Sequence, residues 1–282
     1  MILPANVVGV IYAILSAGVW GAGDFTGGVA SRRSNPFHTL ALSALSGLVI
    51  LAGAALIWRE AFPSPQGILW AMLAGATGAV GIAALYRGLA TGRAASVAPT
   101  SGVIGAALPV LYAIFTQGLP SPAQLAGFGL ACAGIWLVSA PPAGGEPRSR
   151  QELWLACVAG TGFGLFFIFL GMVETGKIFT PLVIARIFSF CTGVLLVRIN
   201  HLPFPGLRSN PTAWLAGLLD AGGNLFYILA RQYTRLDVAA VLSSLYPAST
   251  VILSGLILKE HTSRRNWLGL GLCLAAIGLI TV

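Results

Sequence analysis

Charged side chains are nearly confined to short breaks between apolar stretches of about twenty residues. Of the 282 residues, 9% are charged and 56% are hydrophobic. A soluble domain carries about a quarter charged residues, so this chain has too few to cover a water-exposed surface, whereas lipid can cover the excess apolar area. A helix of about twenty apolar residues crosses a bilayer at ~1.5 Å per residue. The sequence therefore predicts an all-α integral membrane protein.

Charges, prolines and glycines divide the chain into ten expected transmembrane helices. A polar connector begins at Pro141 and separates two halves of five spans each. We expect a first repeat over residues 1–140, a connector over 141–152 and a second repeat over 153–282. The expected spans cover residues 7–29, 36–57, 67–90, 95–117, 123–140, 153–173, 180–198, 212–232, 238–258 and 265–282.

The two halves resemble each other in sequence. Residues 124–139 align with residues 266–281, and Gly75 falls on Gly217 in the same register. A repeat of this length indicates duplication. Because each half has an odd number of spans, the second half must enter the membrane from the opposite side. We therefore predict two inverted five-helix repeats around a central cavity, an arrangement typical of secondary transporters.

Several motifs resemble one transporter family. They are W-G-A-G-D-F-T-G-G at residues 20–28, S-R-R at 31–33, S-S-L-Y-P at 243–247 and Lys259-Glu260. With the ten-span plan, they resemble the EamA branch of the drug/metabolite transporter (DMT) superfamily. Within it the chain is similar to the YddG-type bacterial amino-acid exporters. The resemblance implies that spans 1, 3, 4, 6, 8 and 9 surround the cavity, with spans 2, 5, 7 and 10 outside.

The distribution of basic residues bears on orientation. We call the membrane side on which the chain begins side X, and the other side Y. Connections on side Y carry ten Lys or Arg residues and those on side X carry four. The positive-inside rule makes side Y cytoplasmic, whereas the resemblance implies cytoplasmic termini and hence side X. The orientation stays open, and the expected location is the bacterial inner membrane. The net charge of +8 is explained by these flanking residues, so no nucleic-acid partner is expected.

Two acidic residues, Asp24 and Asp220, lie inside the spans at about 8–10 Å below side Y. Ionisable groups at that depth normally face a partner or a hydrated cavity. Arg87 lies near the Y end of its span and can reach this layer by snorkelling. Arg186 enters its span from side X, so we expect it at the wrong depth. We hypothesise that Arg87 pairs with Asp24 or Asp220 at a gate; a static pair that only fixes helix packing is equally consistent.

Helical spacing places polar and aromatic side chains on shared faces of several spans. Trp20 and Asp24 share one face, and Asp220, Asn224 and Tyr227 share another. An aromatic cavity with a few polar groups suits a small amphipathic metabolite, although each of these residues can instead pack between helices. The candidate substrate-binding residues are Trp20, Asp24, Tyr86, Ser101, Phe163, Phe167, Asn224, Tyr227, Ser244 and Tyr246.

Three prolines are candidate hinges. Pro99 and Pro109 are expected to interrupt span 95–117, and Pro247 to interrupt span 238–258, because proline breaks the hydrogen bonding of a helix. Fixed kinks are the alternative. The four cysteines lie in apolar stretches, without a C-x-x-C pair or a neighbouring histidine, so neither a metal site nor a cofactor is expected.

The leading functional interpretation is export of small metabolites by alternating access, with amino acids as substrates implied by the resemblance alone. Protons are a candidate coupling ion, a monomer in the lipid bilayer is expected, and nucleosides or drugs are other candidate substrates. A second interpretation is an intramembrane aspartyl protease, because G-A-G-D at residues 21–24 matches G-x-G-D and Asp220 supplies a second carboxylate. Against it, the other aspartate of those proteases precedes this motif. A scaffold without transport and a channel are further alternatives; no ring of charges marks a channel filter.

Overall fold

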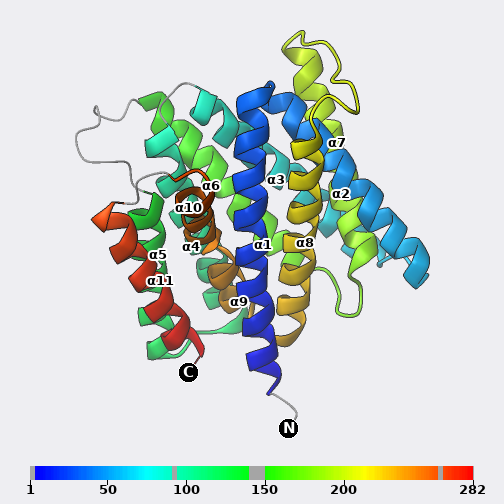
Figure 1. Cartoon of the computed structure of the whole chain (residues 1–282). Coiled ribbons are helices and arrows are strands. Elements are labelled where there is room, and N and C mark those ends of the chain that lie inside the picture. The colour runs from blue at the N-terminus through cyan, green and yellow to red at the C-terminus, as the bar shows by residue number, and fades with distance from the viewer. Residues whose placement is uncertain (1–3, 91–93, 140–149, 260–262, 282) are drawn as a thin grey trace.

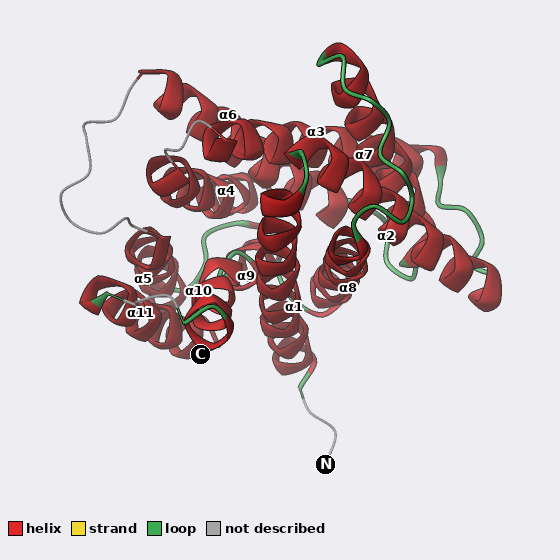
Figure 2. Ribbon diagram, turned by 45° about the horizontal axis from the view of Figure 1, so that its top comes forward, coloured by secondary structure: helices red, strands yellow, loops and turns green. Residues whose placement is uncertain are grey.

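The computed structural model is all-helical over the residues that it describes, 4–90, 94–139, 150–259 and 263–281. The helices lie side by side, and the first described helix begins at the same end of the bundle at which the last one ends (Figures 1 and 2). The elements are α1 (Ala5–Arg33), α2 (Pro36–Trp58), α3 (Pro65–Ala90), α4 (Ala94–Gln117), α5 (Pro122–Ser139), α6 (Arg150–Gly171), α7 (Phe179–Ile199), α8 (Pro211–Tyr233), α9 (Leu236–Ser243), α10 (Tyr246–Ile257) and α11 (Arg264–Thr281).

Within the described ranges, nine segments are long and apolar enough to cross a membrane. They are α1 to α8, with α9 and α10 together as the ninth. The 18-residue helix α11 packs along α5. Each expected span contains one helix, except that α9 and α10 share one span. The expected connector 141–152 lies largely outside the described residues.

Asparagine and proline determine where two of the long helices begin. The Asn35 side chain accepts a hydrogen bond from the backbone N–H of Phe37 at 2.9 Å, and the Asn210 side chain accepts one from Ala213 at 3.3 Å. A proline follows each asparagine at the first helical position. Such a cap satisfies a backbone donor that has no partner within the helix, and proline there loses no hydrogen bond.

The starts of α5 and α11 show the same cap in both halves. Ser121 and Gln124 exchange hydrogen bonds between their side chains and backbone N–H groups. Ser263 and Asn266, each 142 positions further along, make the same exchange. Both are reciprocal capping boxes. The sequence repeat is therefore also a repeat of local structure.

Helix packing repeats in the same way. α1 packs most extensively on α8, α3 on α6, α2 on α7 and α5 on α11. Exchanging the five spans of one half for those of the other leaves this pattern unchanged. The two halves thus contact each other through equivalent helix pairs.

Two glycines lie where the backbones of neighbouring helices approach closely. A Cβ atom on Gly75 of α3 would overlap the backbone of Ala185 in α7, and one on Gly217 of α8 would overlap the backbone of Ser43 in α2. The two pairs are related by the same 142-position shift. Because lipid supplies no hydrophobic force between helices, such close backbone packing is a main source of their association.

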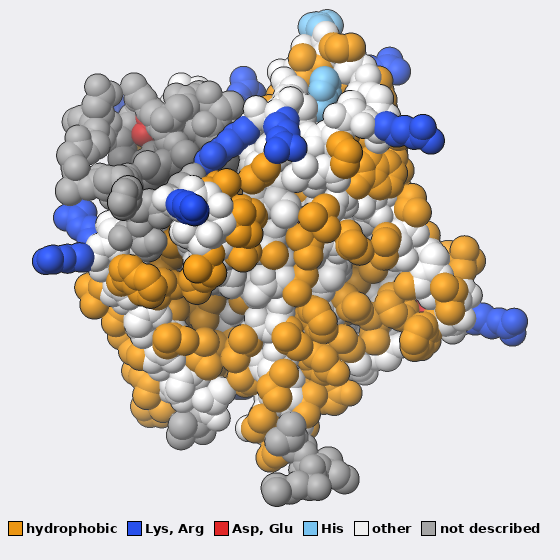
Figure 3. Space-filling model, in the orientation of Figure 1, with side chains coloured by type: hydrophobic (Ala, Val, Ile, Leu, Met, Phe, Trp, Pro, Cys, Tyr) orange, Lys and Arg blue, Asp and Glu red, His pale blue; other side chains and the backbone are white. Residues whose placement is uncertain are grey.

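The outer surface carries large apolar side chains, as a lipid-facing surface requires. Phe115 is 87% exposed, Leu256 74% and Leu274 70%. In Figure 3 apolar side chains cover most of the visible face, and Lys and Arg gather at the end where α1 finishes. The protein is therefore a multi-pass membrane protein by composition and by architecture.

Candidate functional site

A cavity of about 130 Å³ lies between α1, α2, α3, α6, α7, α8 and α10. A buried water needs about 10–15 Å³ of such space, so the cavity has room for several waters or a small metabolite. The expectation that spans 2 and 7 lie outside is wrong, because α2 and α7 both supply lining residues. The backbone contacts at Gly75 and Gly217 bring these two helices close enough to do so. Spans 5 and 10, formed by α5 and α11, contribute no described lining residue. Span 4, formed by α4, was expected to surround the cavity, but it contributes no described lining residue either.

Three charged side chains line the cavity among the described residues: Asp24, Arg186 and Asp220. Arg186 Nη2 and Asp220 Oδ2 form an ion pair, with 9% and 31% of the two side chains exposed. Nη2 makes no well-aligned hydrogen bond. Attraction between the opposite charges, rather than hydrogen bonding, therefore holds the pair together. Asp24 is exposed towards the cavity, and within the described residues no hydrogen bond or ion pair reaches its carboxylate.

The hypothesis that Arg87 is the partner of these acids is wrong. Arg87 is exposed at the end of α3 and does not line the cavity. Arg186 takes its place, seven residues after the start of α7, while Asp220 lies nine residues after the start of α8. The two helices enter from opposite sides, so at ~1.5 Å per residue both residues lie near the middle of the membrane. The length of the arginine side chain closes the remaining gap.

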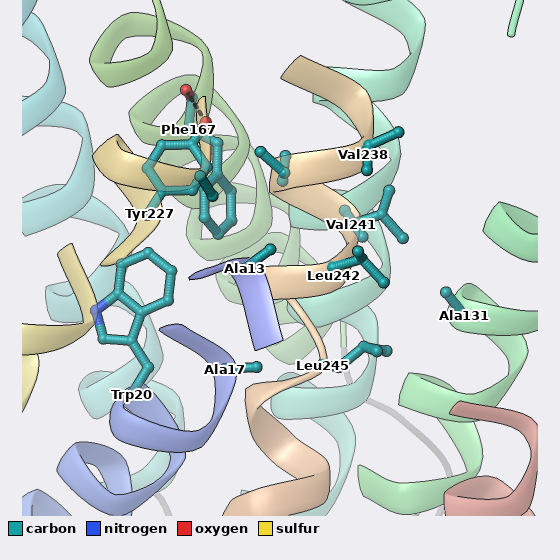
Figure 4. Packing of buried hydrophobic residues seen from close by; sticks show 14 of the residues in the cluster. Ala13, Ala17, Trp20, Ala131, Phe167, Tyr227, Val238, Val241, Leu242 and Leu245 are labelled. Atoms are coloured by element: carbon teal, nitrogen blue, oxygen red, sulfur yellow. Dashed lines mark hydrogen bonds between the residues drawn. The ribbon is translucent and has the colours of Figure 1, made fainter. Parts of the chain in front are cut away.

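Aromatic side chains form the floor of the cavity. The ring centroid of Trp20 lies 5.5 Å from that of Phe167 and 6.1 Å from that of Phe166, both edge-on. Phe163 and Tyr246 also line the cavity. Edge-to-face pairs at these distances are favourable beyond the area that they bury. Figure 4 shows the Trp20 ring directed towards Phe167.

Trp20 is held by the contact between α1 and α8. A Cβ atom on Gly223 would overlap its indole ring, so only glycine leaves room there. One helical turn before Trp20, Ser16 Oγ donates to the Gly223 carbonyl at 2.8 Å. On the same face of α8, the Asn224 amide nitrogen donates to the Asp220 carbonyl at 2.6 Å. The amide oxygen is thereby left to accept from a bound molecule.

Six of the ten candidate substrate-binding residues line the cavity, and three others lie elsewhere. Tyr227 is fully buried behind the floor and donates to the Phe167 carbonyl at 2.6 Å. Ser244 is buried and donates to the Ala240 carbonyl at 2.7 Å within its own segment. Ser101 is buried in α4. The side chain of Tyr86 lies outside the described residues. Those that line the cavity are Trp20, Asp24, Phe163, Phe167, Asn224 and Tyr246.

The expectation that Arg186 lies at the wrong depth is wrong, because it lines the cavity and pairs with Asp220. Three further lining residues were not among the candidates: Phe166, Ser189 and Thr39. For Arg186 the signal was present, because a charged residue well inside a span needs a partner. Thr39 and Ser189 belong to spans 2 and 7, which were expected to lie away from the cavity, so their polar side chains gave no signal of a binding site.

Comparison with known proteins gives a family. The model of the EamA-like transporter family matches the chain twice, over residues 7–140 and 150–282. The chain belongs to the EamA-like transporter family. One solved crystal structure of a protein has a TM-score of 0.70 and 18% sequence identity, covering 98% of this chain and 95% of its own. At that identity the likeness establishes the fold alone. No curated protein matches the chain.

Only one of the two expected proline interruptions occurs in this EamA protein. α4 is continuous from Ala94 to Gln117 and includes Pro109; the side chain of Pro99 lies outside the described residues. The ninth span breaks at Ser244 and Leu245, between α9 and α10, and Pro247 follows in the first turn of α10. A membrane helix can carry a proline where neighbouring helices cover the freed carbonyl, so proline alone does not decide where a break occurs.

The cavity of this EamA protein lies nearer to side Y than to side X. Thr39, three residues from the Y-side start of α2, and Gly27, six residues from the end of α1, line it. Towards side X the space is filled by α9, in which every residue is buried, and by Ala13 and Ala17 of α1. Figure 4 shows α9 packed against these alanines.

Loops from both halves meet on side X. Glu60 after α2 accepts hydrogen bonds from Ile178 and Thr180 at the start of α7, the shortest at 2.7 Å. Glu174 accepts from the backbone N–H of Ser64 at 2.6 Å. These carboxylates connect the α2–α3 loop to the α6–α7 loop and add to the packing that closes side X.

Proposed function

We propose that this EamA protein is a secondary transporter that moves small metabolites across the membrane through the cavity between its two halves. The observation that carries the proposal is the cavity itself, which combines an ion pair, an unpaired carboxylate and an aromatic floor. Such a combination costs folding stability in a membrane and is useful where it binds a ligand.

We infer that the two halves are inverted repeats that work by alternating access. Each half has five spans, the equivalent helix pairs pack alike, and α1 begins at the end of the bundle at which α11 ends (Figure 1). With side X packed and the cavity extending towards side Y, the described conformation is the one open to side Y. The break between α9 and α10 is the proposed bending point, because it lies where closed packing gives way to the cavity.

Within this proposal, amino acids, nucleosides and drugs are the candidate substrate classes, and protons a candidate coupling ion. The proposed setting is a monomer in a bacterial inner membrane. Catalysis is the second candidate, and the pairing of Asp220 with Arg186 weighs against it. An aspartyl protease needs two carboxylates that share a proton, and here one is engaged by a cation.

Solute flux into proteoliposomes tests the proposal. The purified protein is reconstituted and offered amino acids, nucleosides and cationic drugs, with and without a pH gradient. Asn224→Ala removes a polar group from the cavity and is expected to raise KM about tenfold, equivalent to ~1.4 kcal/mol. Leu256→Ala, on the 74% exposed outer surface, is the control and should leave KM unchanged. Peptide cleavage without flux of any solute would overturn the transporter in favour of the protease.

A further inference from the structure

The charges of the cavity do not balance. Its described lining contains two carboxylates, Asp24 and Asp220, and one guanidinium, Arg186. Arg186 is engaged by Asp220, which leaves the Asp24 carboxylate without a counter-charge. An unpaired carboxylate at membrane depth is costly, and a bound cation would remove that cost.

The remainder of the lining is divided into two chemically different walls. Under the 142-position repeat, Asp24 corresponds to Phe166, Asp220 to Gly78, and Asn224 to Ile82. All six residues line the cavity. The α1 and α8 wall therefore carries acids and an amide where the equivalent α6 and α3 wall carries an aromatic ring, a glycine and an aliphatic chain.

This division suits a ligand with a cationic head and an apolar body. The head would lie at Asp24, and the body on Phe166, Ile82 and the floor ring of Trp20. Aromatic faces near the head add cation–π attraction. A zwitterionic amino acid is less suited, because its carboxylate would enter a cavity whose single described cation is already engaged.

We propose that the cavity selects organic monocations, in particular primary amines with an aromatic or aliphatic body, and that Asp24 is the residue that determines this selectivity. The proposal rests on the proposed function and narrows its substrate class. It places amines ahead of amino acids and of neutral solutes of the same shape.

Three ligands that share one ring test the proposal. Phenethylamine is a cation, phenylalanine a zwitterion and 2-phenylethanol neutral. Their affinities are measured by titration calorimetry on the full chain in lipid nanodiscs. We expect phenethylamine to bind at least tenfold more tightly than either of the others. Equal or tighter binding of phenylalanine, or no measurable binding of the amine, would overturn the proposal.

Variants then test the role of Asp24. Asp24→Asn should weaken phenethylamine binding at least tenfold and change 2-phenylethanol binding less than twofold, whereas Asp24→Glu should retain the preference for the amine. Ser43→Ala is the matched control, because it removes a polar group from the cavity without changing its charge. An unchanged amine affinity in folded Asp24→Asn would exclude Asp24 as the determinant.

Flux measurements separate this proposal from the broader one. Amine binding without flux would support the charge argument and contradict transport. Flux of phenylalanine that is unaffected by Asp24→Asn would support transport and overturn the amine selectivity.

Discussion

Arg186 of α7 and Asp220 of α8 form an ion pair that joins two helices entering the membrane from opposite sides. We predict that Arg186→Met destabilises the protein by about 2–4 kcal/mol, because it leaves two uncompensated carboxylates in the cavity. Cavity solvation of Asp220, whose side chain is 31% exposed, keeps the cost below that of a dry pair. Thermal unfolding in detergent measures it.

The double variant Arg186→Met with Asp220→Asn is the control for that prediction. Removing the second charge should recover at least half of the lost stability. A double variant as unstable as Arg186→Met alone would show that packing of the arginine side chain, rather than its charge, is what matters.

The second prediction concerns the duplicated glycine contacts. Gly217→Ala and Gly75→Ala should each cost about 1–3 kcal/mol, because the new methyl group meets the backbone of a neighbouring helix that cannot move aside. Gly53→Ala in α2 is the matched control, since no atom of another helix lies within 4 Å of the place that its new methyl group would occupy. There alanine should be neutral or stabilise the helix by up to ~1 kcal/mol. Thermal unfolding compares the three; equal effects would refute the steric explanation.

Substitutions of two tyrosines should distinguish a loss of folding stability from a loss of ligand binding. Tyr227→Phe removes the hydrogen bond to the Phe167 carbonyl and should cost about 0.5–1.5 kcal/mol with little change in KM. Tyr246→Phe changes a hydroxyl on a residue that lines the cavity and should raise KM with little change in stability. Flux assays and thermal unfolding on both variants check this. A raised KM for Tyr227→Phe with unchanged stability would contradict this prediction and would place Tyr227 in the binding site.

The connection on side X should weaken in acid. Hydrogen bonds from Ser64, the backbone N–H first, hold the pKa of Glu174 below its ordinary value of 4.5, although desolvation acts in the opposite direction. A carboxyl group with a lowered pKa stabilises the folded contact above its ordinary value, and that stabilisation is lost as pH falls through the lowered one. The contact should therefore be unchanged while the pH stays above 4.5, and it should loosen as the pH falls further below that value.

Spin labels at Phe62 and Thr175, on the two loops, measure this loosening as a broader distance distribution. The effect should be small because Glu174 lies in a loop and is only partly buried. Glu174→Gln, which cannot ionise, is the control and should remove the part of the pH dependence that comes from this residue. Identical distributions at about pH 7 and pH 3 in the unmodified protein would rule out the carboxylate connection.

The helices were predictable because their ends are marked locally. Asn35 with Pro36, and Asn210 with Pro211, identify two starts from the sequence alone. The placement of both acids at a shared cavity was also predictable, since a carboxylate inside an apolar span has few other places to lie.

The partner of Asp220 was not predictable, because it depends on how far α7 and α8 overlap in depth and on the reach of one arginine. Tyr227 shows a second limit. Helical spacing places it on the same face as Asp220, but seven residues along a helix is about 10 Å. A shared face therefore extends beyond a small cavity, and Tyr227 lies behind the floor.

The 142-position repeat duplicates the contacts that hold the helices together and leaves the cavity charges single. Gly75 and Gly217 do the same mechanical task twice, whereas Asp24 has an aromatic ring as its counterpart. Under the proposed selectivity, architecture and substrate preference therefore depend on separate sets of positions. A relative could acquire a different cargo through a few substitutions on the α1 and α8 wall while every interhelical glycine stays in place.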